Sequence, residues 1–330
     1  MKLRRRSPRA CLPWLLAAAM ASVHAAAHAQ GAFPDRPVRL LVTVPPGGAV
    51  DLIARVLGKG LSDMWSQPVV IDNKPGAAGL IAGELLAKSP PDGHTLAMMG
   101  DGVVVMRPFM QDKMPYETLT DLVPVAIVAR IPYVLIASPA LKVRNVQELV
   151  SAARTRAGGI DYASSGTGGT HHVGMELFQR AAGITLNHVP YKGGAQALQD
   201  VVAGRVPVMW SAVSTAVPFV REGKLVALAV GDLERSSLMP DVPTVSEAGI
   251  PKFDFSTWMG VMAPKGMPPA LLERLNGDLL KVARSAAYRE SLVSRGSEPA
   301  TSTQREFAER VRTEYERNRV LFKSAGIKGD

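Results

Sequence analysis

Two glycine-rich segments contain the residues of this 330-residue chain that are best suited to bind a ligand. The first covers residues 45–51, Pro-Pro-Gly-Gly-Ala-Val-Asp, and the second covers residues 164–172, Ser-Ser-Gly-Thr-Gly-Gly-Thr-His-His. Each follows a strand-like apolar run and precedes a segment with apolar residues at helical spacing. The first turn of a helix offers unpaired N–H groups and partial positive charge, and glycine leaves room for an anion to approach them. The two segments together predict a site that holds a carboxylate between two loops.

An alternative for either segment is an ordinary tight turn with a helix cap, in which Asp51 and Thr170 are capping residues. Matching strand-to-helix positions in two long loops favour binding, because ligands collect at the carboxyl ends of parallel strands. The candidate ligand-binding residues of the two loops are Pro46, Gly47, Gly48, Ala49, Asp51, Ser164, Ser165, Gly166, Thr167, Gly168, Gly169, Thr170 and His172.

Three further candidates follow other strand-like runs. Tyr191 could donate its hydroxyl to a ligand oxygen and Lys192 could add a positive charge, although packing and a solvated charge are the common roles of these residue types. Ser211 follows a strand that ends at Trp210, so its hydroxyl could face a ligand; the alternative is a helix cap, for which Ser214 competes.

Signatures of catalysis, of cofactor binding and of metal binding are missing from the sequence. It contains no G-x-S-x-G elbow and no G-x-x-x-x-G-K-[ST] phosphate loop, and Gly166-x-Gly168 lacks the third glycine of a dinucleotide fingerprint. His171 and His172 are neighbours, which point about 100° apart on a helix, and no H-E-x-x-H or C-x-x-C accompanies them. We therefore expect a protein that is not an enzyme and has neither a metal nor a cofactor.

The elements that position these loops alternate between strands and helices. Strand-like runs cover residues 38–44, 68–72, 94–99, 123–129, 133–137, 160–163, 185–190, 206–210, 225–230 and 257–263. Helical spacing covers residues 50–65, 77–88, 146–156, 172–182, 195–203, 213–221 and 303–323. This alternation predicts βαβ units in an α/β fold with mainly parallel sheets.

The first 29 residues have the three parts of a secretory leader. Five positive charges precede an apolar run at residues 12–23, and Ala27-His28-Ala29 supplies the small-x-small pattern that signal peptidase recognises. The apolar run is shorter than the roughly 20 residues of a membrane-spanning helix, which favours cleavage over a retained anchor. We expect Sec export to the periplasm and removal of residues 1–29.

Removal of the leader changes the charge of the chain. The formal net charge falls from +9 to +4, because all five leader charges are positive. The remaining Lys and Arg form no dense tract with interleaved aromatic residues, which argues against nucleic acid as a partner. Cys11 is the only cysteine and leaves with the leader, so the mature chain has no disulfide and no thiol nucleophile.

Segments along the whole mature chain resemble the Bug family, the TctC-like solute-binding receptors of tripartite tricarboxylate transporters. Each segment alone is a modest match, but their order and spacing together are specific. They are Phe33-Pro34-Asp35-Arg36-Pro37-Val38, Pro46-Gly47-Gly48 with Asp51, Asn73-Lys74-Pro75-Gly76-Ala77, Pro91-Asp92-Gly93-His94-Thr95-Leu96, Tyr162-Ala163-Ser164-Ser165-Gly166 with His172 and Glu176-Leu177-Phe178, His188-Val189-Pro190-Tyr191-Lys192-Gly193, and Asp241-Val242-Pro243-Thr244-Val245-Ser246-Glu247-Ala248-Gly249.

The resemblance implies a type II periplasmic-binding-protein fold, with two α/β lobes joined by a hinge and a ligand cleft between them. Residues 30–130 and 231–330 would form the first lobe, and residues 131–230 the second. The resemblance also implies a monomer that holds a small carboxylate between the two glycine loops, commonly through ordered waters, and that works with TctA/TctB-like membrane subunits. A sensory receptor that feeds a membrane kinase and an α/β enzyme acting on carboxylates are the alternatives.

The sequence departs from the family pattern at two places that bear on ligand type. The family often has small polar residues where Gly169 and Thr170 stand, and an aromatic–Asp pair where Trp210 and Ser211 stand. A serine at position 211 offers no charge to a ligand ammonium group, whose burial without a partner costs several kcal/mol. We therefore expect a carboxylate without an ammonium group, unless other carboxylates decide the ligand charge; the candidates are Asp51, Glu176 and Asp200.

Overall fold

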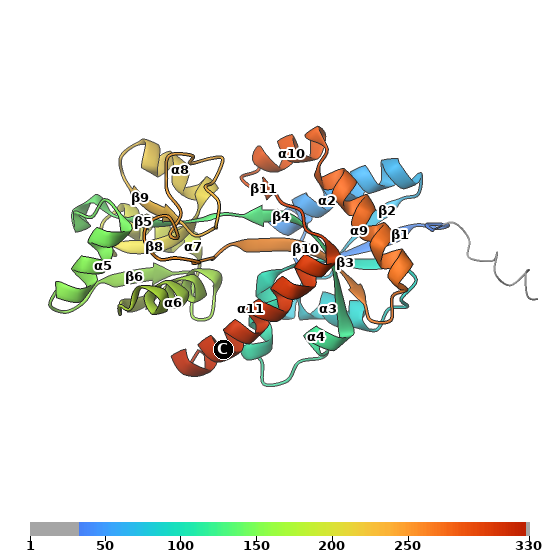
Figure 1. Cartoon of the computed structure of the whole chain (residues 1–330), viewed down its shortest axis with the longest axis horizontal. Helices are drawn as coiled ribbons and strands as arrows, with labels where there is room; N and C mark the ends of the chain where they lie inside the picture. Colours follow the sequence, from blue (N-terminus) through green and yellow to red (C-terminus); the bar gives the residue numbers. More distant parts are fainter. Residues whose placement is uncertain (1–32, 328–330) are drawn as a thin grey trace, which may run out of the picture.

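Two separate β-sheets, each covered by helices, divide the chain into two α/β lobes that lie end to end (Figure 1). The computed structural model describes residues 33–327. The predicted leader, its cleavage site and Cys11 lie outside the described residues. None of the helices in the described part is both long enough and apolar enough to span a membrane.

The first lobe, on the right of Figure 1, contains a six-stranded sheet in the order β11-β4-β10-β3-β1-β2. Its strands are β1 (Val38–Val42), β2 (Val69–Asn73), β3 (Thr95–Gly100), β4 (Leu122–Ile131), β10 (Thr257–Pro264) and β11 (Glu298–Pro299). The second lobe contains a five-stranded sheet in the order β7-β6-β8-β5-β9. Its strands are β5 (Tyr133–Ala137), β6 (Asp161–Ser164), β7 (Asn187–Pro190), β8 (Val208–Ala212) and β9 (Val226–Val230).

The helices cover both sheets, and six of the seven predicted helices begin within two residues of their predicted starts. They are α2 (Ala49–Trp65), η2 (Ala77–Gly79), α3 (Leu80–Ala87), η3 (Gly102–Met106), η4 (Arg107–Phe109), α4 (Thr118–Asp121), η5 (Pro139–Leu141), α5 (Val146–Thr155), α6 (Thr170–Ala182), α7 (Gly194–Val202), α8 (Val213–Arg221), α9 (Pro269–Ala283), α10 (Ala286–Val293) and α11 (Gln304–Ala325). The helix predicted at residues 77–88 begins regularly only at Leu80, because Ala78 and Gly79 have positive φ.

The prediction of mainly parallel sheets is wrong, because both sheets are mixed. Parallel pairs join β1 to β2 and β3, and β6 to β7 and β8. Strand β10 is antiparallel to β3 and β4, and β5 is antiparallel to β8 and β9. The reversed strands are those beside the two connections between the lobes, where the chain runs out along β4 and β5 and returns along β9 and β10.

The chain crosses between the sheets at residues 131–133 and again at residues 231–256. The first crossing is short, with Pro132 between β4 and β5. The second is long, and its side chains pack on the second lobe: Phe253 stacks on Trp210, and Phe255 lies edge-on to the same indole. Side chains from residues 231–256 therefore contribute to the core of the second lobe.

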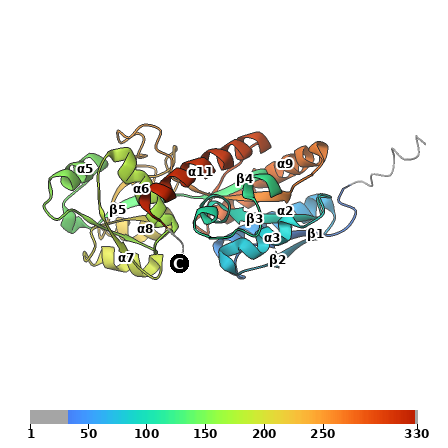
Figure 2. The ribbon, with the colours of Figure 1, turned by 90° about the horizontal axis from the view of Figure 1, so that it is seen from below.

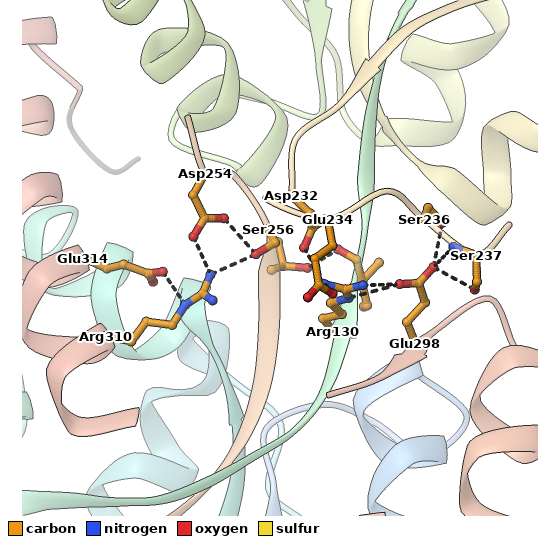
Figure 3. Close-up of polar contacts among 12 residues, drawn as sticks. Arg130, Asp232, Glu234, Ser236, Ser237, Asp254, Ser256, Glu298, Arg310 and Glu314 are labelled. Carbon is orange, nitrogen blue, oxygen red and sulfur yellow. Dashed lines mark hydrogen bonds and ion pairs between the residues drawn. The ribbon is translucent and has the colours of Figure 1, made fainter. Parts of the chain in front are cut away.

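Polar contacts fasten the second crossing to the first lobe (Figure 3). Arg130 on β4 pairs with Glu298 on β11 at 2.9 Å, and Glu298 also accepts hydrogen bonds from Ser236 and from the N–H of Ser237. On α11, Arg310 donates to Ser256 at 2.9 Å. The crossing is thus held at both of its ends by side chains of β4, β11 and α11.

Helix α11 lies along the first lobe, and its C-terminal end reaches the second (Figures 1 and 2). Its start is fixed by a capping box between Thr303 and Glu306. Its apolar side packs on β10, where the Phe307 ring contacts Trp258 edge-on. Near its end, Arg180 of α6 donates to Ser324. This helix therefore contacts both lobes.

Candidate functional site

A cavity of about 290 Å³ lies between the two lobes. One wall comes from the residues that follow β1 and β3, and the opposite wall from the second glycine loop. Tyr133 and Thr257, at the starts of the strands that follow the two crossings, also line it. We take this cavity as the site, in preference to a larger hollow of about 480 Å³ beside Arg130 and Arg310, because it lies at the carboxyl ends of β1 and β3 and includes a predicted loop.

In the first glycine loop, the buried Asp51 organises the turn. Its carboxylate accepts hydrogen bonds of 2.9 Å from the N–H of Gly47, from Arg55 and from Asn73. Burial opposes ionisation, but these hydrogen bonds outweigh it and lower the pKa of Asp51. The Gly47 amide is therefore occupied within the loop.

Of the first loop, residues 45–51, only Val50 lines the cavity. Pro46 and Gly47 are exposed, and Gly48 caps α2, whose first residue is Ala49. The residues of this region that do line the cavity are Thr43, Val44 and Val50.

The second glycine loop reaches the cavity through Gly168, Gly169 and Thr170. Gly166 has φ +121° and Gly168 has φ +72°, so both positions need glycine. The N–H of Gly168 donates to Nδ1 of His172 at 2.9 Å, and that amide too is occupied. Thr170 begins α6, whose first-turn N–H groups lie next to this wall.

Serine and histidine side chains outside the cavity lining stabilise the second loop through hydrogen bonds. Ser164 Oγ lies 2.6 Å from Nε2 of His188 and accepts the N–H of Gly166 at 3.1 Å; Ser165 Oγ lies 2.7 Å from Nδ1 of His171. The rings of His172 and His188 stack with centroids 4.0 Å apart. Thr167, which lies in sequence between Gly166 and Gly168, is exposed. None of these serines or histidines lines the cavity.

Burial lowers the pKa of each of the three histidines, to about 4 for His171 and His188. They are therefore neutral at pH 7, as the bond from the Gly168 N–H to the His172 ring requires. Within residues 33–327, no group of three or more His, Cys, Asp or Glu side chains is arranged to hold a metal ion.

The other three sequence candidates lie away from the cavity lining. Tyr191 donates its hydroxyl to Asp200 at 2.7 Å, and Lys192 is exposed. Ser211 is buried within β8, where its hydroxyl donates to the carbonyl of Ala212 at 3.3 Å. The hydroxyl at position 211 therefore faces its own strand and not the cavity.

Two charged side chains that the sequence analysis did not select do line the cavity. Asp101 follows β3 and is 5 % exposed, and Arg107 begins η4 and is half-buried. Burial raises the pKa of Asp101 to about 7, with a further contribution from Glu314. One sequence feature could have pointed to both residues. The Gly100-Asp101-Gly102 turn follows a predicted strand, just as the two glycine loops do.

Apolar contacts join the two lobes at the edge of the cavity. A Cβ atom placed on Gly168 would lie 2.3 Å from Cε of Met110, and 3.5 Å from Cγ2 of Ile327. Val173 of α6 belongs to the same buried cluster as Phe322 of α11. The described arrangement therefore has the lobes in contact.

Residues 53–327 match the TctC family, described as the tripartite tricarboxylate transporter family receptor. Protein BugT of Bordetella pertussis is 35% identical over 90% of this chain and 91% of its own length.

Two solved structures from Rhodopseudomonas palustris are similar as well. Rpa4515 with adipate is 33% identical, with a TM-score of 0.70 over 89% of this chain and 99% of that one. MatC with bound malate is 30% identical, with a TM-score of 0.65 over 88% of this chain and 99% of that one.

Proposed function

Because the chain belongs to the tripartite tricarboxylate transporter receptor family, we propose that it captures a small carboxylate between its lobes and delivers it to a membrane transporter. The observation that carries the proposal is the cavity lined from both sides, with the second glycine loop and the start of α6 on one wall. Two structurally similar proteins hold small dicarboxylates, adipate and malate. No chemical step is part of the proposal.

Capture would proceed by closure of the lobes around the ligand. A ligand that contacts Thr43 on one wall and Thr170 on the other stabilises the closed form relative to the open one. We propose that the hinge consists of residues 131–133 and of the part of the second crossing near Asp254 and Ser256. The second lobe would then extend from about residue 132 to about residue 256, because residues 231–256 pack on its core.

The finer assignments are export by a cleaved Sec leader, periplasmic location and TctA/TctB-like membrane partners. The basic, apolar and Ala-x-Ala succession of residues 1–29 supports export. N-terminal sequencing of the mature protein should begin near Gln30, and a retained Met1 would contradict the proposal. A pull-down of membrane proteins with the liganded receptor should recover transporter subunits; recovery of a membrane kinase would instead favour the sensory alternative.

Calorimetric titration with a panel of small carboxylates tests the binding function. The panel needs mono-, di- and tricarboxylates of two to eight carbons, with and without hydroxyl, amino or aromatic groups. We expect saturable binding of at least one member, recovered chemically unchanged after long incubation. Absence of binding across the panel, or chemical conversion of the bound acid, would contradict the proposal.

A further inference from the structure

The charged side chains that line the interlobe cavity are one acid and one base, Asp101 and Arg107. The remaining lining is apolar or hydroxyl-bearing, with Thr43, Thr170 and Thr257 among it. A cavity with one group of each sign is electrically complementary to a ligand that also carries one charge of each sign. A dianion would bring two negative charges to a site that offers a single guanidinium.

Arg107 is available to a ligand. It is half-buried in the lining, and no carboxylate of residues 33–327 lies within ion-pair distance of its guanidinium. By contrast, Arg130 on β4 and Arg310 on α11, which lie beside the hinge, are already paired with glutamates (Figure 3). A guanidinium can bind a ligand carboxylate through two parallel N–H···O bonds, which fixes both the position and the orientation of the carboxylate.

Asp101 lacks a partner of its own. Its neighbours on α11 are Glu314, which repels its charge, and Arg310 and Arg317, which attract it. Both of these arginines donate to other groups, Arg310 to Glu314 and Ser256, and Arg317 to the carbonyl of Asp254.

Two uncharged groups also lie near Asp101, the Tyr133 phenol and the N–H of Gly102. The phenol of Tyr133, from β5, is buried near it and is neutral, because burial and the Asp101 charge both raise its pKa. The N–H of Gly102 favours the ionised form of Asp101, but less strongly than burial opposes it. Asp101 is thus a buried carboxyl group in the site that lacks a cation of its own.

Position 211, which the family resemblance connects with amine-bearing ligands, does not line the cavity in this protein. Ser211 lies outside the lining and bonds to the adjacent carbonyl. The absence of a carboxylate at position 211 therefore does not exclude a ligand ammonium group, because Asp101 provides a carboxylate from the first lobe instead.

We infer that the cavity selects an amino-carboxylate, with Arg107 pairing with the ligand carboxylate and Asp101 pairing with its ammonium group; this assignment rests on the proposed function. An ammonium group beside Asp101 would supply the cation that this buried carboxylate lacks. Ion pairing is strong where water is largely excluded. The inference reverses the ligand type expected from Ser211.

The alternative is that neutral Asp101 donates its proton to an anionic ligand. The two cases differ in their pH dependence. Pairing with an ammonium requires ionised Asp101, so affinity falls by up to about tenfold for each pH unit below 7. Donation requires protonated Asp101, so affinity for a diacid falls as the pH rises above 7.

Calorimetry with matched pairs tests the inference on the full mature chain at pH 6 and pH 8. In each pair one carboxylate of the diacid is replaced by an amino group: succinate with 3-aminopropanoate, glutarate with 4-aminobutanoate, and adipate with 5-aminopentanoate. We expect at least one amino acid to bind tenfold or more tightly than its diacid at pH 8 and to weaken at pH 6. Asp101→Asn, nearly isosteric, should abolish that preference, while Asp241→Asn at an exposed aspartate should preserve it. Arg107→Gln should weaken both members of the pair.

The outcomes separate this inference from the proposed function. Tighter binding of the diacid, or a preference that survives in Asp101→Asn, overturns the inference and leaves carboxylate capture standing. Binding of other carboxylates from the wider panel, but of no amino acid, has the same consequence. Failure of every carboxylate to bind overturns both.

Discussion

Gly168 is a position where the backbone conformation disfavours a side chain and where an added Cβ must displace Met110. Its φ of +72° is strained for an L-residue, by about 1–2 kcal/mol, and the Cβ would meet the flexible end of the Met110 side chain across the lobe boundary. Gly168→Ala should therefore weaken ligand binding, by up to about tenfold, because the closed form requires both the strained backbone and a displaced Met110 side chain. Calorimetric affinity is the measurement.

Gly223→Ala is the matched control for that change. Gly223 has a similar φ of +69°, but a Cβ there would meet nothing within 4 Å. It should lose comparable unfolding free energy and retain wild-type affinity. Equal affinities for the two variants would show that Gly168 does not limit closure.

Buried titratable groups act in opposite directions on the pH dependence of stability. His171 and His188 have folded pKa values of about 4, so the unfolded chain binds more protons there between pH 6.5 and 4, and their contribution falls as the pH falls. Asp101 and Asp232 have folded pKa values of about 7, so the folded chain binds more protons there between pH 7 and 4. Their contribution is unfavourable above pH 7 and recovers as the pH falls.

Asp232→Asn should expose the histidine contribution. Removing one of the two opposing carboxyls should make unfolding free energy fall more steeply from pH 6.5 to pH 4 than in the wild type, as measured by urea denaturation at closely spaced pH values. Asp241→Asn, at an exposed site, should leave the wild-type profile unchanged. A parallel profile for Asp232→Asn would mean that this carboxyl is ionised in the folded protein.

The sequence predicted which loops are glycine-rich, but not which of their groups are free. The sequence offers Asp51 as a cap, and Arg55 lies one turn further along α2, but the bond from Asn73 joins positions that only the β1–β2 pairing brings together. The sequence also allows Ser211 to face the ligand. The face of the sheet to which a strand side chain points depends on how that strand pairs with its neighbours, which the sequence does not reveal. The glycine-rich pattern does not select Asp101, because the turn around it is short and contains only Gly100 and Gly102.

Elements were easier to predict than their arrangement. Apolar periodicity located α2, α8 and most strands within a few residues. It could not predict the antiparallel returns of β5 and β10, because strand direction depends on which lobe the chain has reached. The two-residue strand β11 is too short to produce an alternating pattern.

The packing of α11 on β10 depends on a glycine. A Cβ on Gly260 would lie 2.3 Å from the Phe307 ring and 3.3 Å from the carbonyl of Ala126. Gly260→Ala should therefore reduce unfolding free energy by about 1–3 kcal/mol. Gly277→Ala, inside α9 where the added methyl meets nothing within 4 Å, should raise it by up to about 1 kcal/mol. Denaturant titration distinguishes the two, and equal effects would contradict the packing described for α11.

The two-lobed form explains why the chain needs two crossings and a helix that touches both lobes. The family resemblance, and not periodicity, predicted this architecture, since alternating strands and helices fit one sheet as well as two. The long second crossing could be assigned to the second lobe only from its packing on Trp210.

Closure should be measurable in solution by small-angle X-ray scattering. The arrangement in Figure 1 has the lobes in contact at Gly168 and Met110, so it should fit the scattering of the liganded protein. The unliganded protein should have a larger radius of gyration, because apolar contact between lobes is weakened when the cavity is empty. An identical profile with and without saturating ligand would contradict hinge closure.

We propose above that the protein carries a small carboxylate in its interlobe cavity. Native mass spectrometry of the protein, released gently from the cells that make it, tests this capture most directly. We expect an adduct with the mass of one small organic acid, which is lost on acid unfolding and is absent from Gly168→Val. Protein that carries no adduct and acquires none from the carboxylate panel would contradict it.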